Sequence, residues 1–353
     1  MIEIDGSHGE GGGQLLRTAV ALAAVTGTPI RITNIRAGRS NPGLAPQHVA
    51  AVRSVAEVCD GSLTGAAVKS KEMTFVPGRI RGGAFEFDIG TAGSITLVLQ
   101  ALLPVLASGR DVAHVRIVGG TDVRAAPPLD YFRFVLLPLL GRIGVRATLQ
   151  SQRRGYYPRG GGIVALKIEP DSFCPFSTFS KIEPDSFSAA TPGSAQHVDG
   201  ISHVANLPSH IAERMAASAA AALPDQRPLI RTEVLAKDQA IGQGGAIVIW
   251  AETRASVLGA GRVAQRGVPA EVLGGEAGAE LAADLAAGAA LDVHAADQML
   301  SYLALGGGAS TFTTREVTSH ARTAMWLIEQ FLPVRFLTQR SDNLWRVSVA
   351  PSE

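Results

Sequence analysis

The loop at residues 9–14, with the sequence GEGGGQ, lies between a short apolar run and a segment with helical periodicity. Glycine lets backbone N–H groups approach a ligand closely, and a helix N-terminus favours negative charge. The spacing matches neither a dinucleotide-binding fingerprint nor a P-loop, because Glu10 stands inside the loop and no lysine follows it. A carboxylate there would repel a phosphate unless a divalent cation lay between them. Two interpretations stay open, a plain strand-to-helix turn and a phosphate loop.

Arginines near this loop carry groups that recognise phosphate. Arg17 projects from the helix that the loop opens, and Arg36 and Arg39 flank Gly38 in a second loop. A planar guanidinium binds phosphate oxygens in pairs, and long side chains from one loop can converge on one anion. Surface arginines without a ligand are the alternative, so the surrounding elements must decide.

The elements around these residues repeat along the chain. Residues 1–39 and 85–123 share a short strand, a glycine turn, a helix, a β-branched strand and a glycine-containing loop. A second helix follows in each, started by Pro46 or Pro127, where proline is tolerated. Closing strands complete a βαβαββ unit, and residues 291–351 give a third copy. Three such units, each with two helices on one face of a sheet, predict an α+β large domain with pseudo-threefold symmetry.

Residues 186–288 differ in texture, with two alanine-rich helices around an apolar strand. We predict a smaller α/β domain inserted into the third repeat, because insertions succeed at exposed turns where chain ends lie close together. The large domain then comprises residues 1–185 and 289–353. The motif KIEPDSF occurs twice at this junction, at 167–173 and 181–187. We interpret the repeat as a duplication that a surface linker tolerates rather than as a functional motif.

The composition of the 353-residue chain indicates a globular protein of two or three domains. Hydrophobic residues make up 46% and charged residues 18%, and the net charge of +1 excludes a globally basic nucleic-acid binder. No apolar run is long enough to span a membrane, and the N-terminus lacks a signal-peptide pattern. Two cysteines without metal-type spacing suit a reducing compartment. We therefore expect a cytoplasmic protein with no membrane partner.

Ordered motifs along the whole chain resemble the RNA 3′-terminal phosphate cyclase family. The motifs are DGSHGEGGGQLLRTA (5–19), IRAGRSNPGLAPQH (35–48), GTAGSITLVLQALLP (90–104), GGTDVRAAPPLDY (119–131), GYYPRGGG (155–162), AADQM (295–299) and TSHARTAMWLIEQFLPVRF (318–336). The resemblance implies three repeats like the C-terminal domain of a translation initiation factor, with a thioredoxin-like insert. It also implies a ligase that uses ATP to turn an RNA 3′-phosphate into a 2′,3′-cyclic phosphate. Covalent enzyme–(histidinyl)–AMP and RNA(3′)pp(5′)A would be its intermediates.

His320 lines up with the nucleophile of this family. A neutral imidazole nitrogen has a lone pair near neutral pH and can attack phosphorus. The resemblance implies that Glu10 binds the Mg²⁺ or Mn²⁺ that accompanies ATP, which would make the glycine loop a metal-and-phosphate loop. It assigns the phosphates of ATP or of the RNA end to Arg17, Arg36, Arg39 and Gln47, and the adenylate to Gln100, Pro127, His294, Asp297 and Gln298. His294 stands where some members of the family carry tyrosine, which puts stacking on the adenine in doubt.

Two other functions stay open at this stage. One is a catalytically inactive cyclase-like scaffold in ribosomal RNA processing, and the other is an enolpyruvyl transferase built from similar repeats. The expected partners are ATP and RNA 3′-phosphate ends, and a homo-oligomer is left open. The last step needs a 2′-OH, which selects RNA over DNA. The net charge of +1 indicates a small footprint on the RNA end, and the inserted domain is expected to carry no catalytic group.

Overall fold

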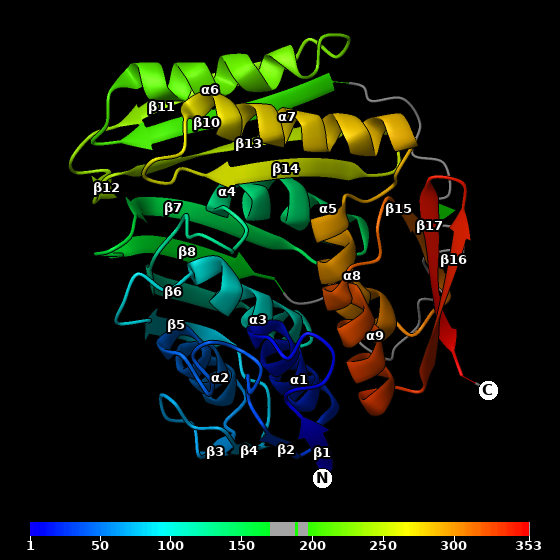
Figure 1. Ribbon diagram of the computed structural model, residues 1–353. Helices are drawn as coiled ribbons and strands as arrows, with labels where there is room; N and C mark the ends of the chain where they lie inside the picture. Colours follow the sequence, from blue (N-terminus) through cyan, green and yellow to red (C-terminus); the bar gives the residue numbers. More distant parts are fainter. Residues whose placement is uncertain (170–187, 190–196, 353) are drawn as a thin grey trace.

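The computed structural model describes residues 1–169, 188–189 and 197–352 (Figure 1). Its first unit is a four-stranded sheet in the order β1-β2-β4-β3, with two helices packed on it. β1 and β2 are parallel, whereas β4 is antiparallel to both of its neighbours. The elements are β1 (Ile2–Asp5), α1 (Gly13–Thr26), β2 (Ile30–Thr33), α2 (Pro46–Val58), β3 (Ser62–Thr64) and β4 (Met73–Val76). Gly27, with a φ of 66°, ends α1 in the left-handed conformation.

The second unit repeats this order as β5-β6-β8-β7, and the short strand β12 from later in the chain extends it beside β7. Its elements are β5 (Gly83–Asp88), α3 (Ile95–Ala107), β6 (Ala113–Gly119), α4 (Leu129–Tyr131), a π-helical turn (Phe132–Leu136), α5 (Leu137–Arg142), β7 (Ala147–Gly155), β8 (Gly162–Ile168) and β12 (Ala240–Ile241). The sequence predicts one helix after Pro127, and the structure shows three joined pieces. Pro138 lacks an N–H and its ring crowds the carbonyl four residues earlier, which the wider π turn accommodates.

The third unit has the order β9-β15-β17-β16, again with a parallel first pair followed by antiparallel pairs. α8 and α9 pack against this sheet (Figure 1). Its elements are β9 (Ser188–Ala189), α8 (Val293–Leu305), β15 (Ser310–Thr314), α9 (Ser319–Phe331), β16 (Val334–Ser341) and β17 (Leu344–Pro351). The chain between β9 and α8 forms a fourth sheet, and we call residues 197–287 the fourth unit.

The fourth unit has the strand order β11-β10-β13-β14 and carries two helices on one face (Figure 1). Its elements, besides β12, are β10 (His197–Ala205), α6 (Ser209–Ala221), β11 (Leu229–Leu235), β13 (Gly244–Glu252), β14 (Val257–Val263) and α7 (Ala270–Ala287). Met215 and Leu281 of the helices belong to one buried apolar cluster with Ile247 of β13. On the opposite face, Trp250 stacks on Phe134 of the second unit with ring centroids 4.5 Å apart. The apolar run in β13 is therefore explained by burial of both faces.

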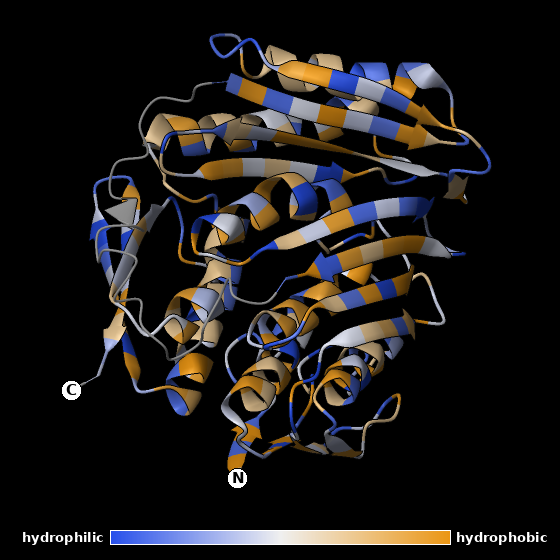
Figure 2. Ribbon diagram, turned by 180° about the vertical axis from the view of Figure 1, so that it is seen from behind, coloured by the Kyte–Doolittle hydropathy of each residue, from blue (hydrophilic) through white to orange (hydrophobic). Residues whose placement is uncertain are grey.

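A single hydrophobic core runs through the first three units and reaches the facing side of the fourth. Hydrophobic residues occur in the helices and sheets of every unit (Figure 2). Because the units share this core, the ends of helices from different units keep fixed positions relative to one another.

The mixed α+β class predicted from the sequence is confirmed. The three sheets share one strand order, while the pseudo-threefold arrangement, the likeness of the insert to thioredoxin and the domain boundaries stay predictions. β9 and β12 both lie inside the predicted insert range yet pair with strands of other units. In the part of the chain described, no helix is long and apolar enough to cross a membrane. Cys59 is buried and free, whereas Cys174 and the second KIEPDSF copy lie outside the described residues.

Candidate active site

A cleft of about 650 Å³ opens where the N-terminal ends of α1, α2, α8 and α9 meet. Helix N-termini carry partial positive charge and N–H groups without intrahelical partners. Every site residue predicted from the sequence lines this cleft: Glu10, Arg17, Arg36, Arg39, Gln47, Gln100, Pro127, His294, Asp297, Gln298 and His320. The structure brings these residues to one place, and their individual roles stay predictions.

The glycine loop folds against α9 before α1 begins. Gly9 has a φ of 59°, a left-handed conformation that favours glycine. A side chain at Gly9 would collide with Thr323 of α9, and one at Gly13 would collide with His48 of α2. Gly12 precedes α1 and offers no side-chain cap, so the first N–H groups of α1 border the cleft uncapped. The loop combines tight packing with a helix end suited to an anion.

Arg17 is a buried cation beside this helix end. The residue is 8% exposed, and no carboxylate of the described chain pairs with it. Its Nη2 donates to Oε1 of Gln100 at 3.4 Å, and its Nε has no hydrogen-bond partner among the described residues. Burial lowers the pKa of the guanidinium to about 10. Because an unpaired buried charge is costly, an anion bound in the cleft would complete this site.

Two further arginines and a neutral histidine extend the positive side of the cleft. Burial and the charge of Arg39 lower the pKa of Arg36. Burial also lowers the pKa of His48 to about 3, with smaller contributions from Arg17 and Arg36, so His48 is uncharged at neutral pH. Gln47 lies beside them at the start of α2. Arg17 and Arg36 therefore line the cleft beside a neutral imidazole, and neither of the two pairs with a carboxylate among the described residues.

Glu10 and His320 form a close pair at the N-terminal end of α9. His320 Nδ1 lies 2.6 Å from Oε2 of Glu10, whose other oxygen pairs with Arg39. The hydroxyl of Ser319 donates to the same Oε2 at 3.3 Å. Burial lowers the pKa of His320, and the positive charge of Arg17 and Arg39 lowers it further against the opposing effect of Glu10. The imidazole is therefore neutral near pH 7, and its Nδ1–H donates a hydrogen bond to Oε2 of Glu10.

The second ring nitrogen of His320 is available for chemistry. Among the described residues, Nε2 has no hydrogen-bond or ion-pair partner. In a neutral imidazole protonated at Nδ1, Nε2 carries the lone pair. The arrangement can deliver a nucleophile to an electrophile held in the cleft.

α8 contributes a carboxylate and an amide to the cleft. The Thr318 hydroxyl donates to Oδ1 of Asp297 at 2.7 Å, and burial raises the pKa of Asp297 to about 7. The side-chain amides of Gln100 and Gln298 bond to each other at 2.7 Å and link α3 to α8. Asp297 can therefore hold or release a proton near neutral pH.

The fourth unit supplies one wall of the cleft, and no motif in the sequence predicts this contribution. Arg262 and Gln265, at and after the end of β14, line this wall. Glu280 of α7 lies 3.2 Å from Nε2 of His294 and 2.6 Å from Nη1 of Arg262. The bond to Glu280 raises the pKa of His294 to about 9. No motif marks these residues, because an arginine on a strand and a glutamate on an alanine-rich helix are typical of solvated surfaces.

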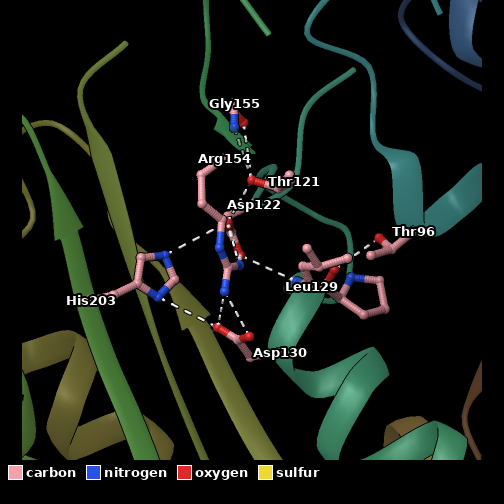
Figure 3. A network of polar contacts seen from close by, with 9 residues as sticks. Thr96, Thr121, Asp122, Leu129, Asp130, Arg154, Gly155 and His203 are labelled. Atoms are coloured by element: carbon pink, nitrogen blue, oxygen red, sulfur yellow. Dashed lines mark hydrogen bonds and ion pairs between the residues drawn. The ribbon is translucent and has the colours of Figure 1, made fainter. Parts of the chain in front are cut away.

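A buried charge cluster holds the second unit against the fourth (Figure 3). Arg154 of β7 pairs with Asp122 at 3.1 Å and with Asp130 at 2.7 Å, and both carboxylates are buried. His203 of β10 lies 3.7 Å from the first carboxylate and 3.5 Å from the second. Burial alone would raise the pKa of Asp122, but Arg154 and His203 hold it below its usual range. The ring of His203 therefore packs the fourth unit against a buried ion-pair cluster whose arginine and carboxylates all belong to the second unit.

The same cluster positions the loop that carries Pro127 to the cleft. Oδ1 of Asp122 accepts from the N–H of Leu129 at 3.2 Å. The hydroxyl of Thr96, on α3, donates to the carbonyl of Pro127 at 2.8 Å (Figure 3). The loop is thus held at two points next to the cleft wall.

Known proteins of one family are similar to this chain along almost its whole length. The model of the RNA 3′-terminal phosphate cyclase family matches residues 8–338. The RNA 3′-terminal phosphate cyclase of Nitrosospira multiformis is 54% identical over 352 residues, which cover 99% of this chain and 97% of the relative. The protein of the same name from Pyrobaculum neutrophilum is 43% identical over 349 residues, covering 99% and 98%. That from Methanopyrus kandleri is 45% identical over 340 residues, covering 95% and 94%.

Proposed function

The chain belongs to the RNA 3′-terminal phosphate cyclase family, and we propose that it uses ATP to convert an RNA 3′-terminal phosphate into a 2′,3′-cyclic phosphate. In the first step His320 attacks the α-phosphate of ATP and pyrophosphate leaves. In the second step AMP passes from the histidine to the RNA 3′-phosphate, giving RNA(3′)pp(5′)A. In the third step the neighbouring 2′-OH attacks the 3′-phosphate and AMP leaves.

The pairing of His320 with Glu10 is the observation that carries this proposal. The contact of 2.6 Å holds the imidazole in one orientation and leaves Nε2 without a partner among the described residues. When Nε2 bonds to phosphorus, the ring gains positive charge, and the Glu10 carboxylate at Nδ1 offsets it. Handing AMP onward returns the ring to its neutral form. A scaffold protein would have no chemical need for this pair in a cleft of this kind.

The positive side of the cleft supports the proposed phosphate sites. Arg17 lacks a carboxylate partner among the described residues and lies beside the uncapped start of α1. We propose that Arg17, Arg36, Arg39 and Gln47 bind the phosphates of ATP or the RNA end. The proposed adenylate contacts also line the cleft: Gln100, Pro127, His294, Asp297 and Gln298.

Glu10 is also the proposed ligand for Mg²⁺ or Mn²⁺. Within the described residues, no group of three His, Cys, Asp or Glu side chains could hold a metal by itself. One carboxylate nevertheless fits a cation that arrives with ATP, because Mg²⁺ keeps several waters and uses one or two carboxylates plus substrate phosphates. Such a cation would neutralise charge on the pyrophosphate leaving group.

Labelling with ATP tests the proposed function. The protein is incubated with Mg²⁺ or Mn²⁺ and with ATP labelled in either the α- or the γ-phosphate, and is then run on a denaturing gel. The α-label should stay on the protein and the γ-label should leave as pyrophosphate. Adding RNA with a 3′-phosphate should then discharge the α-label. An inactive scaffold or an enolpyruvyl transferase would retain neither label.

The proposal extends to the arrangement of the fold. We propose that the first three units are repeats related by pseudo-threefold symmetry, with a thioredoxin-like domain inserted between the first strand and first helix of the third. The strand order shared by the three sheets supports this. A cytoplasmic location and self-association stay predictions.

A further inference from the structure

Aromatic and basic side chains gather on a surface next to α9. The ring of Trp326 stacks on that of His8, with centroids 3.6 Å apart and planes inclined by 16°. One turn earlier on α9, the guanidinium carbon of Arg322 lies 5.4 Å from the ring centroid of Trp345. Arg340 of β16 lies 6.0 Å from the same ring. We call these five residues the aromatic–basic stripe.

The stripe adjoins the cleft through the two segments that carry its central pair. His8 lies two residues before Glu10 in the glycine loop, and Arg322 lies two residues after His320 on α9. The N–H of Glu10 donates to the Thr323 hydroxyl at 3.3 Å, which fixes the loop against α9. The stripe therefore begins just outside the point where the acid meets the histidine.

The stripe has groups that the folded chain leaves unused. His8, Arg322 and Arg340 are exposed, and Trp326 and Trp345 are partly exposed. Neither arginine pairs with a carboxylate in the described part of the chain. One face of the His8 ring is covered by Trp326, and the exposure of His8 leaves a stacking surface for a flat ligand.

We propose that the aromatic–basic stripe binds the nucleotides just upstream of the RNA 3′-phosphate, with a base stacked on His8 and backbone phosphates near Arg322 and Arg340. The proposal rests on the proposed function, which places the terminal phosphate at His320. Stacking on aromatic rings combined with basic groups holds single strands with little sequence preference. A short surface of this kind also agrees with a chain whose net charge is only +1.

Binding of RNA without ATP tests this surface independently of catalysis. The probe is a short single-stranded RNA with a 5′-fluorophore and a 3′-phosphate, and the Kd for the full chain is measured by fluorescence anisotropy. His8→Ala should raise the Kd on the order of tenfold, the factor to which 1.4 kcal/mol of lost base stacking corresponds. His8→Phe should restore most of the affinity, because a phenyl ring also stacks. Arg322→Gln should weaken binding and reduce its salt dependence.

A matched control and a second ligand make the outcome decisive. Arg214→Gln removes an exposed arginine on α6 that pairs with Glu271 at 3.2 Å, and it should leave the Kd unchanged. A nucleoside 3′-monophosphate, which has no upstream nucleotide, should compete equally well for wild type and His8→Ala. An unchanged Kd for the RNA in His8→Ala, or an equal loss for the monophosphate, would overturn the proposal. Failure of the proposed function shows separately, as absence of the α-label on wild-type protein.

Discussion

At the scale of single residues, the account of the cleft depends on Arg17 and on the pairing of His320 with Glu10. The sequence motifs placed Arg17 near a phosphate, but only the structure shows it buried without a carboxylate partner among the described residues. The motifs likewise marked His320 and Glu10, and the structure adds their 2.6 Å contact. We therefore expect a substitution at such a position to lower activity while raising the free energy of unfolding, and both quantities can be measured.

Arg17→Met should make the protein more stable and less active. Removing an unpaired buried charge should raise the free energy of unfolding by about 1 to 2 kcal/mol, the usual gain from relieving a costly functional position. The α-label on the protein should fall sharply, because the phosphates lose a donor. Denaturant unfolding and ATP labelling measure the two effects, and Arg214→Met serves as the exposed control. A destabilised variant that still labels normally would refute this account of Arg17.

Glu10→Ala should weaken adduct formation and move its Mg²⁺ or Mn²⁺ dependence to higher concentration. Losing one preorganised electrostatic contact costs about 2 to 4 kcal/mol of transition-state stabilisation. Glu10→Gln keeps an acceptor for Nδ1 of His320 without the charge, so it separates orientation of the ring from metal binding. Adduct yield is measured against metal concentration for both variants. If neither titration moves, Glu10 is a turn residue and binds no metal.

At the scale of elements, the sequence predicts those helices and strands whose formation depends on residues within one segment. Residues 13–26 form a helix after a glycine turn, as expected, because apolar periodicity and the turn lie within one segment. β3 and β9 are too short to show a strand pattern and were not predicted. The helix after Pro127 was expected to be continuous and is divided, because Pro138 interrupts its hydrogen bonding.

The sequence predicts the cleft residues that lie within motifs. It does not predict the residues that come to the cleft only because separate units pack together. Arg262 and Gln265 line the cleft, and Glu280 contacts two of its lining residues, because the fourth unit packs on the second. The packing of one unit on another cannot be predicted from the motifs of a single sequence. The expectation that this unit carries no catalytic group stays a prediction, although the unit forms part of the wall.

Glu280→Gln should raise the KM for ATP by up to about fivefold and change the rate of adduct formation less. The limit follows because an ion pair to a half-exposed partner such as His294 contributes about 0.2 to 1 kcal/mol. Loss of the carboxylate should also lower the pKa of His294 from about 9. Glu276→Gln is the matched control, since Glu276 contacts Arg262 at 3.0 Å but not His294. Equal KM values in both variants and wild type would contradict this role.

At the scale of the whole molecule, the interface between the second and fourth units contributes both to stability and to the geometry of the cleft. The cluster of Arg154, Asp122, Asp130 and His203 joins the second unit to the fourth and fixes the loop at the cleft wall. No sequence pattern connects His203 to these partners, because the contact depends on how separate sheets pack. The relative placement of the units was therefore beyond prediction from sequence.

Asp122→Asn should lower the free energy of unfolding at pH 7 by about 3 to 5 kcal/mol, the cost of removing one partner from a buried ion pair. The folded-state pKa of Asp122 lies below its unfolded value, so its stabilisation is present above about pH 4 and is lost as the pH falls through the folded-state pKa. The difference between variant and wild type should therefore shrink in acid. Urea unfolding over a pH series measures it, and a difference that grows in acid would contradict the assignment.

The nature of the bond between AMP and the protein decides the central claim. His320→Asn should keep the fold, because Asn replaces a half-exposed side chain in the first turn of α9 and leaves Thr318, the N-cap of that helix, in place. It should abolish the adduct, because the lone pair of an amide nitrogen is delocalised and cannot attack phosphorus. Given pre-made RNA(3′)pp(5′)A, the variant should retain part of the cyclising activity, since proximity of the 2′-OH supplies on the order of 7 to 11 kcal/mol of such a barrier.

The most direct measurement is the α-label on denatured wild-type and His320→Asn protein, before and after treatment with acid or alkali. The account predicts a wild-type adduct that is stable in alkali and labile in acid, as a phosphoramidate is, and no label on His320→Asn. Label retained by a folded His320→Asn variant would contradict it, because the nucleophile would then be another residue.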